Sequence, residues 1–577
     1  MSENGQRAPD GAAAIVTALA EAGTSVLFGV PGGGPNLDVV GAAEAADMRF
    51  VLTHTETAAV IMAATHADLT GRPGAAVVTR GPGLASAVNG IAHAALDRLP
   101  VVVIADTVRS AEAGRISHQR LDLAALSRSA GKDVITVGRD RPGAAAAEAV
   151  RLARQPPAGP VVALMDDSGR SGPLVPLIPL AGDPAGHGED DLAVLAGALR
   201  ASRRPVVLLG ADAIAHTEAI RSALAGRGLP VLHTYRARGV IPDSADEAAG
   251  LVTGATMEWP LLAGADLILG LGVDEAEMIP ASWDYAAPTL LAGGHPPGAP
   301  AYFRGATRLQ VALPAAIGVL AAGHNSHDWP PGVGRAARAA VIRQLVATAT
   351  GRAGALSPVQ VVTAVRSHAP RDAIVTVDAG AHMLAVMPLW ETDTPRRLLI
   401  SSGLATMGYA LPAAIAAALA DPGRLVIAFT GDGGLSMTLA ELETSVRLRL
   451  RIAVVVFNDA TLSLIKIKQR PTGQGGGAAV DFGPVSYAAV AQAMGAAGTA
   501  AGTERELTEA ISAAAHHDGP TVVDVRTDPA GYPAIMELSR GQASRRPLPG
   551  LDRHGTPGKQ TSPEIPPERA ASAKEQT

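Results

Sequence analysis

The sequence has no cysteine and few aromatic residues. Its 577 residues include 4 Trp, 6 Tyr and 6 Phe. The absence of cysteine excludes disulfide bonds, thiolate catalysis, cysteine-ligated zinc fingers and iron–sulfur clusters. At roughly 100–200 residues per domain, a chain of this length predicts about three to five domains.

Positive charge is not in surplus, and long apolar runs are also missing. The chain carries 48 Lys and Arg against 54 Asp and Glu, a net charge of −6, which argues against a nucleic-acid-binding surface as the main function. The longest apolar stretches, such as Leu411–Ala420 and Ile452–Phe457, are much shorter than the ~18–20 residues that span a bilayer. Met1–Asp10 has no apolar segment of the kind found in signal peptides. We therefore predict a cytoplasmic protein that binds neither nucleic acid nor membrane.

Short runs rich in Val and Ile recur along the chain, with alanine-rich stretches between them. Such runs are typical of parallel strands that are buried on both faces of a sheet. Strands that alternate with helices predict an α/β protein of doubly wound parallel sheets, in which ligands bind beyond the carboxyl ends of the strands. The predicted strands are Ser25–Gly29, Ala75–Thr79, Val101–Ala105, Val161–Leu164, Val206–Gly210, Leu267–Gly270, Ala373–Asp378, Leu425–Thr430, Ile452–Asn458 and Thr521–Val525.

Changes in composition divide the chain into three doubly wound domains and a tail. Glycine and proline cluster near Pro173–Pro184, and a polar stretch with proline lies around His324–Gly334. The segment from Gly541 onward is rich in proline and charge and has almost no apolar periodicity, which is typical of a flexible tail. The predicted units are residues 1–180, 187–340 and 355–540, followed by a tail of residues 541–577.

Two acidic residues follow neighbouring buried strands in the third domain. The first of these strands leads into Gly431-Asp432-Gly433-Gly434, an amphipathic helix follows, and the next strand ends at Asn458-Asp459. Because parallel strands joined by one crossover end at the same edge of a sheet, we expect Asp432 and Asp459 to meet there. Carboxylate oxygens beside a glycine-rich turn suit Mg²⁺ bound to a phosphate group. The alternative is two unrelated polar turns.

The order Gly-Asp-Gly, helix, strand, Asn-Asp resembles the thiamine-diphosphate binding motif. Residues 11–540 follow the order of segments in the acetolactate synthase and 2-oxo acid decarboxylase family. The resemblance implies a pyrimidine-binding N-terminal domain, a central domain, and a C-terminal domain that binds the diphosphate and Mg²⁺. It puts Asp432, Asp459 and Thr461 in the metal-binding positions.

Further segments of the first domain carry the same resemblance. Phe28–Gly34 (FGVPGGG), Thr53–Ala59 (THTETAA) and Thr70–Gly83 are similar to successive segments of the family's pyrimidine-binding domain. They put Glu56 on the glutamate that bonds the pyrimidine ring, so that the cofactor's own amino group can remove the thiazolium C2 proton. Taken alone, Glu56 is equally consistent with a carboxylate that stabilises a helix start.

Segments of the third domain resemble the diphosphate-binding part of the family. Val377–Met383 (VDAGAHM) is similar to the turn that contacts the diphosphate, and Gly403–Ala414 (GLATMGYALPAA) to the segment beneath the cofactor. The resemblance gives Met407 the role of wedging the two cofactor rings, although a methionine there could also simply fill the core. The implied cofactor contacts in this domain are Ala379, Gly380, Ala381, His382, Ala405, Met407, Gly433 and Gly434.

Two stretches of the first domain resemble acetolactate synthase segments near the substrate. Ser117–Asp122 and Ser127–Asp133 put Gln119 and Lys132 on that enzyme's active-site glutamine and lysine, and a lysine there would attract the carboxylate of a 2-oxo acid. His118 stands where relatives have an aromatic residue, and an imidazole in the pocket could relay protons. The alternative for each of these three residues is a solvated polar side chain.

Other positions depart from the biosynthetic acetolactate synthases. Lys468 stands in place of a tryptophan and Leu464 in place of a methionine, which leaves the substrate open. The central domain lacks the segments that hold FAD in flavin-containing members, since Leu269–Trp283 stands where one of them is expected. We therefore predict that FAD is not a cofactor.

The resemblance implies an enzyme that uses thiamine diphosphate and Mg²⁺ to decarboxylate a 2-oxo acid, after which a proton or a second carbonyl compound captures the product carbon. Two alternatives stay open. One is a non-decarboxylating lyase or acyltransferase acting, for example, on an acyl-CoA, and the other is a non-catalytic paralogue. Because the family's sites lie between subunits, the resemblance also implies a homodimer or homotetramer.

Overall fold

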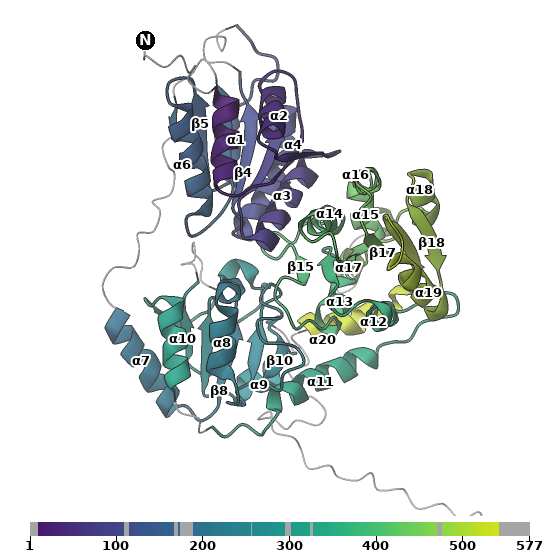
Figure 1. Cartoon of the computed structure of the whole chain (residues 1–577). Coiled ribbons are helices and arrows are strands. Elements are labelled where there is room, and N and C mark those ends of the chain that lie inside the picture. Colours follow the sequence, from purple (N-terminus) through teal and green to yellow (C-terminus); the bar gives the residue numbers. More distant parts are fainter. Residues whose placement is uncertain are drawn as a thin grey trace, which may run out of the picture.

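The chain forms three α/β units, each built on its own sheet (Figure 1). The computed structural model describes residues 10–108, 115–166, 171–173, 188–254, 257–294, 302–323, 327–469 and 476–541. The predicted tail lies outside these residues except for Gly541. The prediction of three doubly wound α/β units is confirmed. Each sheet falls within one of the predicted domain ranges, while the boundaries themselves stay a prediction.

The N-terminal unit, purple to blue in Figure 1, has a seven-stranded sheet in the order β2-β1-β3-β4-β6-β5-β7. Its strands pair in parallel, except that the two-residue β7 is antiparallel to β5. The strands are β1 (Val26–Val30), β2 (Arg49–Leu52), β3 (Gly74–Val78), β4 (Val101–Asp106), β5 (Asp133–Gly138), β6 (Val161–Asp166) and β7 (Gly172–Pro173). The helices are α1 (Gly11–Glu21), α2 (Pro35–Ala45), α3 (Glu56–Thr70), α4 (Pro82–Leu96), α5 (Leu123–Ala130) and α6 (Pro142–Arg154).

The central unit, teal in Figure 1, has a six-stranded parallel sheet in the order β10-β9-β8-β11-β12-β13. Its strands are β8 (Pro205–Leu209), β9 (Val231–His233), β10 (Ala248–Leu251), β11 (Leu267–Leu271), β12 (Thr289–Ala292) and β13 (Thr307–Leu309). Its helices are α7 (Gly188–Ala201), α8 (Thr217–Leu224), α9 (Trp259–Gly264) and α10 (Leu313–Ala322), and α11 (Val333–Val346) leads on to the third unit.

The C-terminal unit, green to yellow in Figure 1, also has six parallel strands, in the order β15-β14-β16-β17-β19-β18. The strands are β14 (Ile374–Val377), β15 (Leu398–Ile400), β16 (Val426–Gly431), β17 (Ile452–Asn458), β18 (Ala497–Ala501) and β19 (Thr521–Arg526). The helices are α12 (Pro358–His368), α13 (Met383–Leu389), α14 (Ala410–Ala420), α15 (Asp432–Thr438), α16 (Glu441–Arg447), α17 (Ser463–Gln469), α18 (Tyr487–Ala493), α19 (Glu504–Ala514) and α20 (Tyr532–Arg540).

The first and third sheets share one topology. When strands are numbered within each unit and β7 is left aside, both read 2-1-3-4-6-5. In both, the chain turns back beside the first strand, and doubly wound folds bind ligands at such a point, beyond the carboxyl ends of the strands. The chain therefore contains two equivalent sheet edges that could each contribute to a site.

Glycine followed by proline starts two helices at the carboxyl edge of the first sheet. Gly34 and Gly81 have φ values of 62° and 64°, which L side chains rarely adopt. Pro35 and Pro82 then occupy the first position of α2 and α4, where a missing N–H costs nothing. These dipeptides turn the backbone sharply from strand to helix at this edge.

An apolar core joins the first and third units. It contains residues of α3, α4 and α14, so these helices pack against one another across the boundary between the two units. Alanine dominates this core, because small side chains let helix faces meet closely. Its helical members include Ala58, Ala59, Ala63, Ala64, Ala87, Ala94, Ala410, Ala413, Ala414, Ala416 and Ala417.

One partly buried acidic residue joins all three units. Asp68 on α3 accepts from Arg396 of the C-terminal unit at 3.0 Å, and it pairs with Arg236 of the central unit at 3.4 Å. Arg236 also donates to the backbone carbonyl of Asp97 at 2.5 Å. The burial cost of each charge is offset by an opposite charge from another unit, which fixes the units relative to one another.

Every strand predicted from the sequence is present, but the outer strands of each sheet were missed. The missed strands are β2, β5, β7, β9, β10, β12, β13, β15 and β18. The amphipathic helix predicted after Gly431 was also incorrect in form: the chain makes two short helices, α15 and α16, with a break at Leu439 and Ala440. Within the described part of the chain, no helix combines the length and the apolar character that crossing a bilayer requires.

Candidate active site

A cavity lies at the carboxyl edge of the third sheet. It holds about 720 Å³ of empty space, including solvent at its mouth. The cavity collects the residues predicted to contact the diphosphate half of a cofactor or the metal: Ala379, Gly380, Ala381, His382, Ala405, Met407, Asp432, Gly433, Gly434, Asp459 and Thr461. The segments after β14, β15, β16 and β17 therefore converge on one space, as the topology predicts.

His382 gives the cavity a buried polar atom without a partner. Its ring stacks on Phe457 with ring centroids 5.2 Å apart, and Nε2 has no hydrogen-bond partner among the described residues. Burial lowers the pKa of His382 to about 3, so the imidazole is neutral at physiological pH. Gly380 leaves room for this ring, because a Cβ there would lie 2.7 Å from the imidazole. A buried nitrogen of this kind calls for a ligand acceptor or donor.

Asp378 ties the segments around the cavity together. Its carboxylate accepts from the backbone N–H of Tyr409 and from the hydroxyl of Thr430, both at 2.9 Å. Burial raises the pKa of Asp378 to about 6. This carboxylate links the ends of β14 and β16 to the segment that carries Ala405 and Met407. Ala405 itself has φ of 52°, a left-handed conformation that non-glycine residues hold only when the surrounding structure enforces it.

Asp432 and Asp459 meet at this edge, as the sequence predicted. Oδ2 of Asp432 accepts from the backbone N–H groups of Asp459 at 3.1 Å and Ala460 at 2.6 Å. Oδ2 of Asp459 accepts from the hydroxyl of Ser463 at 2.5 Å. Burial raises the pKa of Asp432 to about 6, and burial together with the charge of Asp432 raises the pKa of Asp459 to about 7. Two adjacent carboxylates, that of buried Asp432 and that of partly buried Asp459, are the kind of oxygen donors that a hard divalent cation prefers.

Thr461 lines the same part of the cavity, but its hydroxyl forms hydrogen bonds with other residues. Oγ1 donates to the carbonyl of Val480 at 3.2 Å or to Asp481 at 2.5 Å. Its carbonyl accepts from the N–H of Ser463 at 2.9 Å and keeps a second lone pair. The carbonyl of Thr461 therefore has a lone pair that is available for a metal.

The glycines after Asp432 are required by close packing. A Cβ at Gly434 would lie 2.0 Å from Oδ2 of Asp378, and a Cβ at Gly433 would lie 2.7 Å from Leu462 and 3.5 Å from Met407. Only glycine lets the first turn of α15 lie against the cavity wall. The predicted turn is thus the junction of β16 and α15, with Asp432 as the first helical residue.

Glu56 and Gln119 lie at the equivalent edge of the first sheet and do not line the cavity. Glu56 is the first residue of α3, and its Oε1 would lie 3.3 Å from a Cβ at Gly83. Gln119 has φ of 56° and packs against Gly81, where a Cβ would lie 3.0 Å from its own Cβ. These residues form a second cluster around the strand-to-helix turn after β3. Within one chain, the predicted site is therefore divided into two parts.

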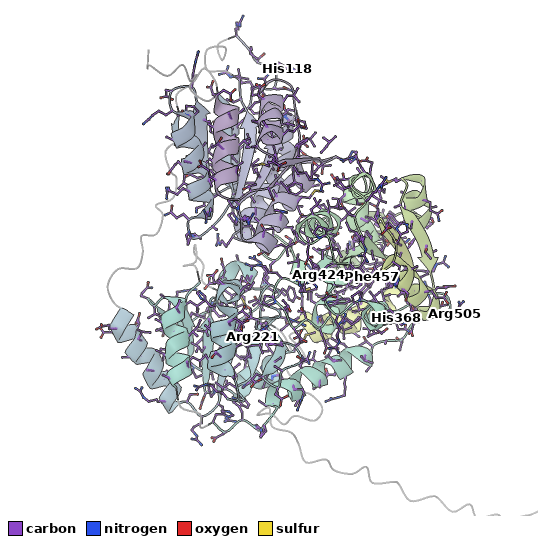
Figure 2. The ribbon with its side chains drawn as sticks, in the orientation of Figure 1. His118, Arg221, His368, Arg424, Phe457 and Arg505 are labelled. Atoms are coloured by element: carbon purple, nitrogen blue, oxygen red, sulfur yellow. The ribbon has the colours of Figure 1, made fainter. Side chains whose placement is uncertain are left out.

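His118 and Lys132 do not line the cavity. His118 is exposed at the end of the N-terminal unit, far from Phe457 and the cavity (Figure 2). Lys132 precedes β5 and so lies at the amino edge of the first sheet, opposite Glu56. Its Nζ donates to the carbonyls of Leu152 at 2.6 Å and Gln155 at 2.5 Å, at the end of α6. These bonds make Lys132 a helix cap in this structure.

Several cavity residues were not predicted as site residues. Phe457, Leu462 and Ile465 form apolar walls, and Leu464 lies beside them, whereas Lys468 is exposed and does not line the cavity. Phe457 directly precedes the Asn-Asp pair, so its position could have been inferred from that motif. Tyr532 comes from α20, which no motif marks, and only packing brings it to the cavity.

Three segments of the chain match the domains of one family. The N-terminal thiamine pyrophosphate binding domain matches residues 9–126, the central domain matches residues 192–289, and the C-terminal thiamine pyrophosphate binding domain matches residues 378–525. The chain belongs to the thiamine pyrophosphate enzyme family. The matched C-terminal segment runs from Asp378 to Val525 and contains most of the cavity, but it ends before Tyr532.

Curated members of the thiamine pyrophosphate enzyme family align along nearly their whole length. The catabolic acetolactate synthase of Raoultella terrigena is 30% identical, over 91% of this chain and 96% of that protein. An acetolactate synthase of Bacillus subtilis is 28% identical, over 90% and 93%. The solved thiamine diphosphate-dependent 4-hydroxybenzoylformate decarboxylase of Rhodococcus jostii has a TM-score of 0.75 at 20% identity, over 90% and 99%, and thus shares the fold. The resemblance drawn from the sequence is confirmed.

Proposed function

We propose that this protein uses thiamine diphosphate and Mg²⁺ to decarboxylate a 2-oxo acid. The carbon atom that loses CO₂ would then form a bond to a proton or to a second carbonyl compound. The observation that carries the proposal is the cavity at the carboxyl edge of the third sheet. It combines an unpartnered imidazole nitrogen, a glycine-lined wall and two adjacent carboxylates, those of Asp432 and Asp459. The similarity to acetolactate synthases supports the 2-oxo acid as substrate class.

The residues present fit the diphosphate and the metal. Binding of the anionic diphosphate would favour the protonated imidazole of His382, whose Nε2–H would then donate to a phosphate oxygen. The backbone of Gly380, Ala381 and Gly433 lies open to the same space. Asp432, Asp459 and the carbonyl of Thr461 would hold Mg²⁺, whose charge would offset the repulsion between the two carboxylates. Both groups would thus be held by oxygen and nitrogen atoms that otherwise lack full partners.

The remaining roles concern the pyrimidine ring. The carbonyl of Ala405 would accept from the amino group of the ring, and Met407 would support the bent cofactor from below. The carboxyl of Glu56 would share a proton with the ring nitrogen. When bound, the cofactor itself supplies a nucleophilic carbon and the electron sink for decarboxylation. The protein itself would orient the cofactor and transfer the proton between Glu56 and the pyrimidine ring. The apolar walls at Phe457, Leu464 and Ile465 would exclude water.

The separation of Glu56 from the cavity supports an assembly of at least two copies. In one chain the Glu56 cluster and the cavity lie at different sheet edges, so a second copy would bring its Glu56 to the first copy's cavity. Large apolar side chains are exposed at both edges, as a subunit interface requires: Leu37, Leu52 and Leu121 in the first unit, and Met437, Ile465 and Phe482 in the third. We therefore propose a homodimer, or a homotetramer built from it.

Cofactor-dependent turnover tests the proposal. The full chain is incubated with thiamine diphosphate and Mg²⁺, and CO₂ release is measured against a panel of 2-oxo acids that includes pyruvate. We expect CO₂ release that depends on both cofactors and is lost in Glu56→Gln. Cofactor binding without CO₂ release, but with cleavage of an acyl-CoA, would favour the non-decarboxylating alternative. Failure to bind thiamine diphosphate in the presence of Mg²⁺ would overturn the proposal.

A further inference from the structure

A fully buried glutamate of the third unit forms hydrogen bonds with the segment that carries Glu56. Oε1 of Glu441 accepts from the backbone N–H groups of His54 and Thr55, each at 3.0 Å, although 386 residues separate Thr55 from Glu441. Glu441 has no exposed surface, and its Oε2 accepts from the hydroxyl of Thr444 at 2.8 Å. Both oxygens of this carboxylate are therefore committed, one of them to the two residues that precede Glu56.

Two other residues of α16 also contact this segment. Glu443 pairs with the ring of His54 at 2.8 Å, and Arg447 donates to the carbonyl of Leu52 at 2.7 Å. Of these contacts, those of Glu443 are half exposed, and exposed pairs contribute little. The bonds of Glu441 are buried and charge-assisted, which makes them the strong ones. They also act on backbone rather than on side chains, so they fix where α3 begins.

Thr55 transmits this constraint to Glu56. Its hydroxyl caps α3 by accepting from the N–H of Ala58 at 3.2 Å, and Glu56 is the first residue of that helix. With the N–H of Thr55 held by Glu441 and its side chain held by the helix, the direction of the Glu56 side chain is set from the third unit. The chain thus places Glu56 through a residue that lies in the same crossover between β16 and β17 as Asp432.

We propose that Glu441 is a positioning residue that sets the orientation of Glu56 for its exchange of a proton with the cofactor. The inference rests on the proposed function, since it gives Glu56 its role there. In an assembly where Glu56 serves the cavity of a second copy, Glu441 connects two active sites. Its own chain's Asp432 would hold the metal of one site, while the glutamate it orients acts in the other.

Two measurements on the same variants test this role. In the cofactor-free full chain, hydrogen–deuterium exchange reports the protection of the amides of His54 and Thr55. In the chain saturated with thiamine diphosphate and Mg²⁺, the rate of exchange of the cofactor's C2 proton reports the proton transfer that depends on Glu56. Titration gives the dissociation constant of the cofactor. Glu441→Ala removes the acceptor, Glu441→Asp withdraws it while keeping the charge, and Glu441→Gln keeps an oxygen in place. Glu443→Ala, on the same helix, is the matched control.

We expect Glu441→Ala to expose both amides and to slow C2 proton exchange about tenfold or more, because two charge-assisted hydrogen bonds are lost. The cofactor dissociation constant should change less than about threefold, since the cavity itself is intact. Glu441→Asp should act in the same direction and serves if the alanine variant does not fold. Glu441→Gln and Glu443→Ala should both stay near wild type.

The outcomes separate this inference from the proposed function. Wild-type C2 exchange in Glu441→Ala or Glu441→Asp at saturating cofactor would overturn the positioning role, even if the amides become exposed. Unchanged amide protection in these variants would also overturn it. If the wild-type chain itself binds the cofactor without C2 exchange, the proposed function fails, whereas the amide measurement still decides whether Glu441 holds the segment.

Discussion

Asp459 donates its backbone N–H to Oδ2 of Asp432 at 3.1 Å, so the position of the second carboxylate of the proposed metal pair depends on the first. Asp432→Ala would remove the acceptor of three backbone N–H groups, those of Gly433, Asp459 and Ala460, and a proposed metal ligand. We expect a loss of stability of about 1–3 kcal/mol and at least about a hundredfold weaker Mg²⁺ binding. Asp459→Asn should keep an oxygen donor and remove the charge repulsion, so its Mg²⁺ affinity should fall much less. Calorimetric titration of both variants decides this; equal losses would contradict the assignment.

The unpartnered nitrogen of His382 predicts a role in recognising the diphosphate. Replacing His382 by Ala should raise the dissociation constant of thiamine diphosphate about tenfold, in line with the loss of one hydrogen bond in a buried site. The affinity for thiamine monophosphate should change less. Fluorescence or calorimetric titration with both compounds measures the difference. An unchanged preference for the diphosphate would show that His382 binds some other part of the ligand.

Lys132 offers a test of a residue that the resemblance placed in the active site. Lys132→Met removes two hydrogen bonds to the last carbonyls of α6 but keeps the aliphatic stem. We expect a loss of unfolding free energy of about 1–2 kcal/mol, with kcat/KM for the best 2-oxo acid unchanged. Thermal unfolding and steady-state kinetics of the same preparation give both values. A large rise in KM at wild-type stability would instead support a substrate contact.

Buried Glu277 of the central unit predicts a pH-dependent stability. Its carboxyl accepts from the N–H of Ala211 at 2.9 Å and from the hydroxyl of Thr234, and burial raises its pKa from 4.5 to about 7. Between these two values the folded protein keeps a proton that the unfolded chain has lost. The free energy of unfolding should therefore fall as the pH rises through this window, by up to about 3 kcal/mol.

Comparison with Glu277→Gln isolates this contribution. The variant cannot ionise, so it should match wild type near pH 4.5 and become relatively more stable as the pH approaches 8. Urea denaturation at several pH values measures the difference. Glu218→Gln, at an exposed position, is the control and should follow wild type throughout. Parallel curves for wild type and Glu277→Gln would contradict the prediction.

The sequence predicted the centre of each sheet and missed its outer strands for a physical reason. Central strands such as β17 are buried on both faces and read as continuous apolar runs. Outer strands are short or mixed: β2 is Arg-Phe-Val-Leu, with exposed Arg49 and Leu52, and β18 consists of small residues. Their strand conformation comes from pairing with a neighbour, which local composition does not record.

The same limit applies to the candidate site. Asp432 and Asp459 were predictable because each directly follows a recognisable strand, whereas Ala405 and Met407 follow the missed strand β15 and were assigned through the resemblance. The division of the site between the first and third units was expected from the resemblance to the family, not from the composition of the segments. Tyr532 and Glu441 were also missed, because each acts through a contact with residues far away in the sequence.

The alanine-rich core between α3, α4 and α14 has a consequence for protein engineering. The C-terminal unit is not an exchangeable module, because cutting it out would expose the face of α14 that α3 and α4 cover. A chimera that takes its C-terminal unit from a relative would have to take the matching faces of α3 and α4 as well. Recombination within this family should therefore succeed more often when the crossover leaves these three helices from one parent.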